Sequence, residues 1–189
     1  MPKLYYKSNN QKDPYTSSWS IKEIIGIRLW NIIWNIFFRF SPKKFGRYWR
    51  IFLLKCFGAK IDWSVFLYSS SKIYVPWLLT MERKSCLGPK SEVYNLGPVY
   101  IRERATISQY AYICNGTHDL SNPKNPLMIG NIEIGENVFI GARAFLMPGV
   151  KIAKNAVVGA CAVVIKDVNE SDIVGGNPAK FIKKREIIG

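Results

Sequence analysis

Histidine and cysteine are scarce in this sequence of 189 residues, which limits the chemistry that it can carry. There is one histidine, His118, and the four cysteines are scattered without a C-x-x-C pair. Zinc sites need several such ligands at close spacing, so we predict no metal centre. The first apolar run starts near Ile21 and no small-residue cleavage site follows it. We therefore predict no signal peptide, reduced thiols and a cytoplasmic location.

Long uninterrupted apolar runs are also missing, and none approaches the roughly 18–20 residues that span a bilayer. Residues 19–40 instead place apolar side chains at steps of three or four, which predicts a helix with a wide apolar face. A second helix is predicted from Pro42 to about Phe57, with Ser41 as its N-cap and Gly58 as its stop signal. The stepped apolar positions of the first helix are Ile21, Ile25, Leu29, Ile32, Ile36 and Phe40.

Acidic residues are nearly absent from the first third of the chain. Residues 1–60 carry 12 Lys and Arg against 2 acids (12 − 2 = +10), and residues 61–189 carry 15 against 11 (15 − 11 = +4). The two helices could pack on the rest of the molecule or on a neighbouring subunit, with their cations in solvent. They could also contact an anionic membrane peripherally from its inner face, with Trp at headgroup depth and Lys and Arg on lipid phosphates. Both arrangements can hold together. No nucleic-acid-binding motif is present, so no nucleic-acid partner is predicted.

A period of six residues dominates the remainder of the chain. Neither a helix nor a half-buried strand has this period, whereas in a parallel β-helix each side of a turn is formed by six residues. Shorter runs of the same period occupy 61–79, 81–93 and 101–113, separated by two shifts of phase. A small or branched residue follows four positions after each aliphatic one, and Trp77 is an exception to this rule. We predict a mainly β protein, a parallel β-helix. The longest run is formed by Ile134, Ile140, Leu146, Ile152, Val158 and Val164.

Residues 116–133 interrupt the period, and they contain two prolines, three asparagines and His118. A repetitive scaffold carries its function where the repeat is broken, so we predict an active-site loop here. The chain then divides into a polar N-terminal arm (1–18), a basic and aromatic-rich helical hairpin (19–58) and a repeat domain (59–189). The repeat domain ends in a short C-terminal tail or helix.

Several segments resemble the hexapeptide-repeat acyltransferases: the hexads, the N-G-T-H-D run at 115–119, and residues 140–150, 157–168 and 175–185. The runs PYTSSWS, FGAKI, VPWLL and VYNLGPV are similar to those of the colanic-acid-biosynthesis (WcaF-like) acetyltransferases. The resemblance covers about residues 14–185. It implies a left-handed β-helix, a homotrimer, and acetyl-CoA bound as co-substrate in the groove between neighbouring subunits.

The resemblance also implies roles for residues near the break. A loop histidine is the general base of this family, and His118 occupies that position. A neutral imidazole can take the proton of a sugar hydroxyl, which is otherwise a poor nucleophile. Asp119 is expected to orient the His118 ring, although a backbone carbonyl could do so instead. Asn95 is expected near the acceptor substrate, with a structural role at a corner as the alternative.

Cofactor-binding positions follow from the same resemblance. Ala142 and Ala160 are expected where the pantetheine arm runs against the wall, although a β-helix corner also demands small residues. Lys166, Lys180 and Lys183 match basic positions near the phosphates of coenzyme A, with a solvated basic tail as the alternative. The family often has threonine where this chain has Ile165, so one cofactor hydrogen bond is in doubt. Cys161 is expected to pack inertly in the wall.

These features together predict an acetyl-CoA-dependent O-acetyltransferase. Its acceptor is expected to be a sugar hydroxyl of a surface polysaccharide or of its lipid-linked glycan precursor. Two alternatives remain open: a non-catalytic β-helix scaffold for polysaccharide assembly, and an acyltransferase with an amine acceptor or a longer acyl donor. A zinc carbonic anhydrase on the same scaffold is disfavoured because one histidine does not supply its ligands.

Overall fold

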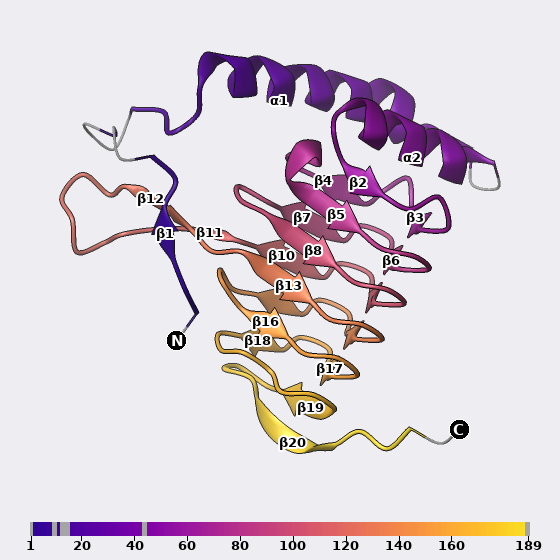
Figure 1. Ribbon diagram of the computed structural model, residues 1–189, viewed down its shortest axis with the longest axis vertical. Coiled ribbons are helices and arrows are strands. Elements are labelled where there is room, and N and C mark those ends of the chain that lie inside the picture. Colours follow the sequence, from indigo (N-terminus) through magenta and orange to yellow (C-terminus); the bar gives the residue numbers. More distant parts are fainter. Residues whose placement is uncertain (1, 9–10, 12–15, 43–44, 188–189) are drawn as a thin grey trace.

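The predicted parallel β-helix is confirmed by a computed structural model that describes residues 2–8, 11, 16–42 and 45–187. Short strands stack into three walls, and the chain visits walls 1, 2 and 3 in turn (Figure 1). Wall 1 contains β2 (Lys60–Ile61), β5 (Leu79–Met81), β8 (Val99–Ile101), β13 (Ile132–Ile134) and β16 (Lys151–Ile152). Wall 3 contains β4 (Lys72–Ile73), β7 (Glu92–Tyr94), β10 (Tyr112–Cys114), β15 (Phe145–Leu146) and β18 (Val163–Val164).

Wall 2 is the longest wall, and its last strand closes the C-terminal end of the stack. It contains β3 (Phe66–Leu67), β6 (Cys86–Leu87), β9 (Thr106–Ile107), β14 (Phe139–Ile140), β17 (Val157–Val158), β19 (Asp172–Gly175) and β20 (Lys180–Lys184). The predicted C-terminal tail or helix is therefore a strand, because β20 folds back antiparallel on β19. This return covers the final turn.

The aliphatic residues of the period form the core. Every one of them lies inside the stack with at most 3% of its surface exposed, and the small residues four positions later fill the corners. In parallel walls, partner residues stack directly on one another, as Ile107 does on Leu87 and Ile140 on Ile107. A continuous apolar column results, so each turn is stabilised mainly by its two neighbours.

The interruptions of the period all fall at one corner, where the chain passes from wall 3 to wall 1. The first holds the short 3-10 helix Pro76–Leu78, the second holds residues 95–98, and the third is the segment around His118. We call this edge of the stack the hairpin corner. Between Leu146 and Ile152 the same corner needs no additional residues, so the period continues there unbroken.

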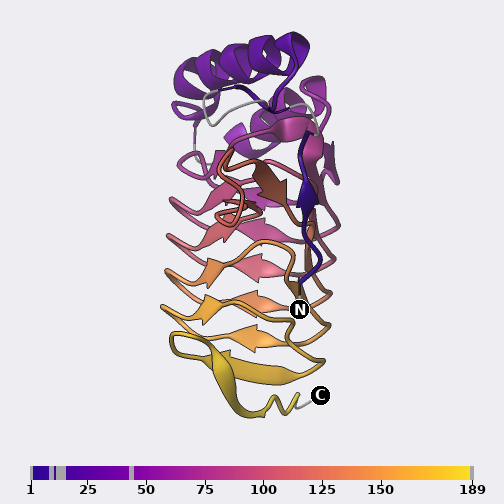
Figure 2. The same ribbon diagram turned by 90° about the vertical axis from the view of Figure 1, so that its left-hand side faces the viewer.

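The helices cover the N-terminal end of the stack (Figures 1 and 2). Helix α1 (Ile21–Ile33) begins at Ser20, whose hydroxyl accepts from the Glu23 amide while the Glu23 carboxylate accepts from the Ser20 amide. It continues into a π-helical turn, Trp34–Phe38. The indole N–H of Trp30 donates to the Ile73 carbonyl at 2.7 Å, so this face of α1 packs on wall 3.

Helix α2 (Gly46–Cys56) starts later than predicted and has no side-chain N-cap. The hydroxyl of Ser41 instead donates to the Phe38 carbonyl at the end of the first helix and accepts from the guanidinium of Arg50 at 2.8 Å. Arg50 also donates to the Leu67 carbonyl, which fixes α2 to wall 2. The predicted stop is confirmed, since Gly58 has a φ of +83°. Lys43 and Lys44, expected in this helix, lie outside the described residues.

No helix within the described ranges has the length and apolarity needed to cross a bilayer.

Candidate active site

The segment around His118 is a β-hairpin rather than the irregular loop predicted from its prolines and asparagines. Strands β11 (Gly116–His118) and β12 (Leu127–Ile129) pair antiparallel, and β1 (Tyr5–Tyr6) of the N-terminal arm adds to the outer edge of β12. This small sheet projects from the hairpin corner (Figures 1 and 2). Wall 1 resumes at Ile132, so the last residues of the predicted loop already belong to the stack.

The hairpin is anchored by a buried asparagine at its base. The Asn115 side chain accepts from the Gly97 amide at 3.0 Å and donates to the Pro98 carbonyl, while its backbone carbonyl accepts from the Gly130 amide. Gly116 follows, and a Cβ there would lie 2.6 Å from the Leu96 side chain. A larger residue here would therefore require the Leu96 side chain to shift.

His118 is exposed at the end of β11, and its ring contacts the connection between β11 and β12. Its Nδ1 atom lies 2.7 Å from the carbonyl oxygen of Asn125. A carbonyl can only accept a hydrogen bond, so Nδ1 carries the hydrogen in this contact. In the neutral ring, Nε2 then has the free lone pair, which is the tautomer that a general base requires.

Asp119 lies beside His118 in the chain, but its carboxylate is bonded to other groups. One oxygen accepts from the hydroxyl of Tyr6 at 2.8 Å, and the other accepts from Ser121. These hydrogen bonds, that from Ser121 first, hold the pKa of Asp119 below its usual value. In this geometry Asp119 ties the N-terminal arm to the hairpin, and the Asn125 carbonyl orients the His118 ring.

Asn95 occupies the corner one turn before Asn115 and is completely buried. Its side chain accepts from the Val75 amide at 2.9 Å and donates to the Val75 carbonyl at 2.6 Å. Both polar atoms of the side chain are thus engaged with the backbone of the preceding turn. This geometry is that of the structural corner residue, the alternative role for Asn95.

Two hollows flank the hairpin. One, of about 280 Å³, is lined by His118, by the aromatic rings of Trp19, Tyr74 and Tyr94, and by polar residues of the arm. The other, of about 420 Å³, lies along the hairpin corner and is largely apolar; Thr117, Met147, Pro148, Ile165, Lys166, Pro2 and Leu4 line it. His118 therefore faces a polar-aromatic hollow, and the adjacent Thr117 faces an apolar one with a cation at its edge.

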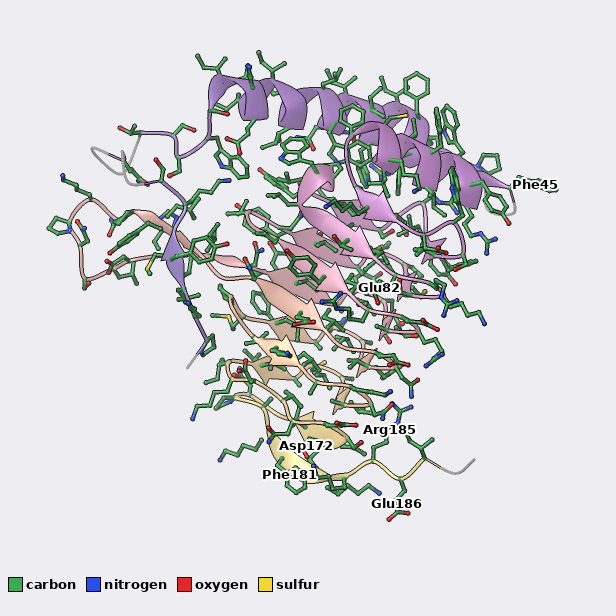
Figure 3. The ribbon with its side chains drawn as sticks, viewed as in Figure 1. Phe45, Glu82, Asp172, Phe181, Arg185 and Glu186 are labelled. Carbon is green, nitrogen blue, oxygen red and sulfur yellow. The ribbon has the colours of Figure 1, made fainter. Side chains whose placement is uncertain are left out.

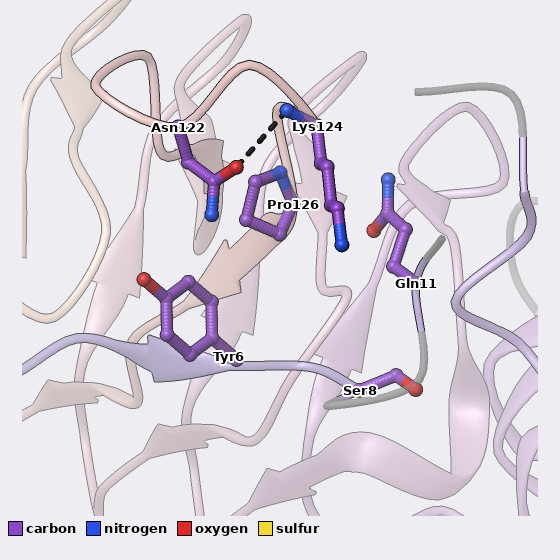
Figure 4. A pocket seen from close by; sticks show the side chains of 6 residues that line it. All are labelled: Tyr6, Ser8, Gln11, Asn122, Lys124 and Pro126. Carbon is purple, nitrogen blue, oxygen red and sulfur yellow. Dashed lines mark hydrogen bonds between the residues drawn. The ribbon is translucent and has the colours of Figure 1, made fainter. Parts of the chain in front are cut away.

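A third hollow, of about 230 Å³, lies between the arm and the tip of the hairpin (Figure 4). Tyr6, Ser8 and Gln11 line it from the arm, and Asn122, Lys124 and Pro126 line it from the hairpin. The arm therefore lines one side of this hollow. The sequence analysis treated residues 1–18 only as a polar arm, because two-residue pairing such as that of Tyr5 and Tyr6 leaves no periodic signal.

The residues predicted to bind cofactor lie on different edges of the stack. Lys166 is at the hairpin corner, beside the 420 Å³ hollow. Ala142 and Ala160 lie on successive turns of the corner between walls 2 and 3, where the Ala142 carbonyl accepts from the Cys161 amide. Lys180 and Lys183 are exposed on β20. One chain alone does not bring this set together.

Cys161 also lies at the corner between walls 2 and 3, and its position differs from the one predicted. It is exposed and has a φ of +59°, so it does not pack inside the wall. The thiols of Cys56, Cys86 and Cys114 are free as well. Among the residues that the structure describes, no three His, Cys, Asp or Glu side chains are grouped closely enough to hold a metal ion.

The outer surfaces of the walls differ in character. Wall 3 carries a row of stacked rings, Tyr74, Tyr94, Tyr112 and Phe145, with neighbouring centroids 4.8–6.2 Å apart. Burial within this row raises the pKa of Tyr112 to about 12, so its hydroxyl stays protonated at neutral pH. Wall 1 carries charge instead, with Arg102 bonded to both Glu82 and Glu133.

Known proteins match both the repeat and the whole chain. Residues 131–166 fit the family model "Bacterial transferase hexapeptide (six repeats)". "Putative colanic acid biosynthesis acetyltransferase WcaF" of Escherichia coli K12 is 37% identical over 161 residues, which cover 85% of this chain and 88% of that protein.

Solved structures share the fold. A maltose O-acetyltransferase from Clostridium difficile 630 superposes with a TM-score of 0.78 at 18% identity, covering 89% of this chain and 90% of that one. The hexapeptide-repeat acetyltransferase VCA0836 of Vibrio cholerae O1 biovar eltor, complexed with acetyl coenzyme A, gives 0.77 at 20% identity, covering 89% and 92%. With these matches, the period-six core and the hairpin at its third interruption, the chain belongs to the hexapeptide-repeat acetyltransferases.

Proposed function

We propose that this acetyltransferase transfers the acetyl group of acetyl-CoA to a hydroxyl of a sugar, with His118 as the general base. The observation that carries the proposal is the contact between His118 Nδ1 and the Asn125 carbonyl, because it leaves Nε2 free on a ring that faces a hollow. Trp19, Tyr74 and Tyr94 supply flat apolar surface there, and the arm supplies polar groups. Such a combination suits a sugar ring.

The apolar hollow at the hairpin corner suits the other substrate. Met147, Pro148 and Ile165 would accept a thin, mostly apolar arm, and Lys166 would meet phosphate at its edge. Acetyl-CoA would supply the activated acetyl group as a thioester. His118 Nε2 would take the proton of the attacking hydroxyl and pass it to the departing thiolate, so no covalent link to the enzyme is required.

The separation of the predicted cofactor residues supports a homotrimer. Lys166 borders wall 3 on one side, and Ala142 and Ala160 border it on the other. If a neighbouring subunit packed against the aromatic row of wall 3, the Lys166 edge of one subunit would face the Ala142 and Ala160 edge of the next. The two edges would then complete a groove. In a cyclic trimer, contacts between two different surfaces of this kind close into a ring. Sedimentation equilibrium is expected to give three times the chain mass at micromolar concentration, and a stable monomer would contradict this assembly.

The relationship to WcaF supports an acceptor from surface-polysaccharide synthesis, either the polymer or its lipid-linked precursor. A panel of nucleotide-linked and lipid-linked sugars, incubated with acetyl-CoA and monitored by thiol release, tests this. We expect a base-labile O-acetyl ester on a lipid-linked glycan. A base-stable amide as the product would establish an amine acceptor instead. No thiol release with any acceptor, from a trimer that binds acetyl-CoA, would favour a scaffold role.

A further inference from the structure

Helix α1 has apolar side chains on two opposite faces, and the residues that the structure describes cover only one of them. Trp30 and Trp34 on the inner face donate to the Ile73 and Ser71 carbonyls of the stack. These tryptophans are therefore committed to the walls and do not lie at headgroup depth. The outer face of α1 and its π-helical extension is 50–77% exposed, and it consists of Ile21, Ile25, Leu29, Ile32, Ile36 and Phe40.

Basic residues accompany this outer face. Residues 19–58 contain eight Lys and Arg and a single acid, Glu23 (8 − 1 = +7). Lys22, Arg28 and Arg39 are exposed along the helix. The carboxylate of Glu23 is bonded to Ser20 and Lys7, so it does not offset these three cations. The surface therefore combines a row of exposed aliphatic side chains with uncompensated positive charge.

We propose that the outer face of α1 docks on an anionic lipid surface, with the helix lying flat at the headgroup boundary. An apolar face flanked by Lys and Arg has the chemistry of interfacial helices, which gain affinity from buried apolar area and from attraction to anionic lipid. A second copy of this chain is a poorer occupant, because pairing the faces would oppose Lys22, Arg28 and Arg39 of one copy with the same cations of the other.

The position of α1 also sets how the molecule stands on the lipid. The helix lies across the end of the stack, so its outer face points away from all the turns (Figure 1). Phe45, at the start of α2, projects from the same end, while Phe181 lies at the opposite one (Figure 3). The stack axis is thus roughly normal to the membrane, and parallel copies in a trimer would present their α1 helices to one plane.

Flotation with lipid vesicles tests this docking on the full chain. We expect the protein to float with vesicles containing phosphatidylglycerol at low salt, to be released by high salt, and to stay behind with neutral phosphatidylcholine vesicles. Changing Lys22, Arg28 and Arg39 to Gln should lower the partition coefficient by at least roughly tenfold. Failure of the wild-type protein to float with anionic vesicles at low salt would overturn the proposal.

A matched pair of triple variants separates this face from a general effect of added charge. In the first, Ile25, Leu29 and Ile32 become Glu; in the second, Phe181, Ile182 and Ile187 at the opposite end become Glu. The replaced residues are similarly exposed, at 50–60% and 55–62%. The first variant should lose vesicle binding and the second should retain it, both with wild-type circular dichroism. Equal binding by the two variants would refute the assignment. So would a change in sedimentation mass in the first alone, because the face would then bind another copy. The readout does not depend on acetyl transfer, so it stands apart from the proposed function.

Discussion

The Nδ1 atom of His118, at the end of β11, lies 2.7 Å from the carbonyl oxygen of Asn125, in the connection that leads to β12. The contact spans the connection between the two strands, so the conformation of that connection orients the ring. Because the partner is a backbone atom, no substitution of the Asn125 side chain removes it directly. The neighbouring Asp119 serves a different contact, with Tyr6 of the arm.

Asp119 and Tyr6 should therefore act as a pair. We expect Asp119→Ala and Tyr6→Phe each to loosen the arm and to lower turnover far less than loss of His118 does. The double variant should be little worse than either single one, because both remove the same contact. Turnover of the four proteins measures this. Fully additive losses would instead assign Asp119 a role independent of the arm.

The same pair predicts a dependence on acid. The pKa of Asp119 is lowered by its hydrogen bonds from Ser121 and Tyr6, so the carboxylate stays charged to a lower pH than an ordinary aspartate does. Its contact with the arm is then kept at neutral and mildly acidic pH and is lost only as the pH falls through the lowered pKa. NMR signals of the Tyr5 and Tyr6 amides, followed from neutral to acid pH, should shift in that range. In Tyr6→Phe this transition should move toward the ordinary aspartate range.

Substitution of Asn95 should lower the stability of the protein rather than lower its substrate affinity specifically. Asn95→Ala would leave the buried amide of Val75 without its partner, while the Val75 carbonyl would still accept from the Leu78 amide. We expect the free energy of unfolding to fall by about 1–3 kcal/mol, the cost of one buried amide left without a partner. The exposed Asn169→Ala is the matched control and should cost little. A raised acceptor KM in an Asn95→Ala protein of unchanged stability would restore the substrate role.

The interior of the stack could be predicted from sequence, since the six-residue period reports directly which side chains point inward. The corner geometry could not. In the sequence, Asn95 and Asn115 are isolated polar residues. In the structure, each side chain forms hydrogen bonds with the backbone of the preceding turn. The strands of the hairpin are three residues long and are paired by tertiary context, so composition indicated only a loop. For helix α1, periodicity found the apolar residues, but both faces are apolar, and only the packing of Trp30 shows which face is covered.

Substitutions of Cys161 distinguish a role as nucleophile from a role as corner residue. Its φ of +59° suits glycine, so Cys161→Gly should keep activity and leave stability unchanged or raise it by up to about 1 kcal/mol. Cys161→Ala should also keep activity. Thermal unfolding and turnover of both variants test this expectation, and loss of activity in both would indicate an acyl-enzyme.

Lys166 should act on acetyl-CoA rather than on the acceptor. Replacing it with Ala removes a cation from the edge of the apolar hollow. If it meets a phosphate, the Kd for acetyl-CoA should rise roughly 10–100-fold, the usual range for a charged hydrogen bond. Lys154→Ala, which breaks an exposed ion pair with Glu136, is the control and should leave the Kd unchanged. An unaltered Kd in Lys166→Ala would remove this residue from the cofactor site.

Turnover of His118→Gln, measured together with its affinity for acetyl-CoA, tests the central claim most directly. We expect turnover with the glycan acceptor to fall by roughly 10²–10⁴-fold, the usual contribution of a general base, while the Kd for acetyl-CoA stays at the wild-type value. Wild-type turnover in His118→Gln would contradict the assignment of His118 as the base.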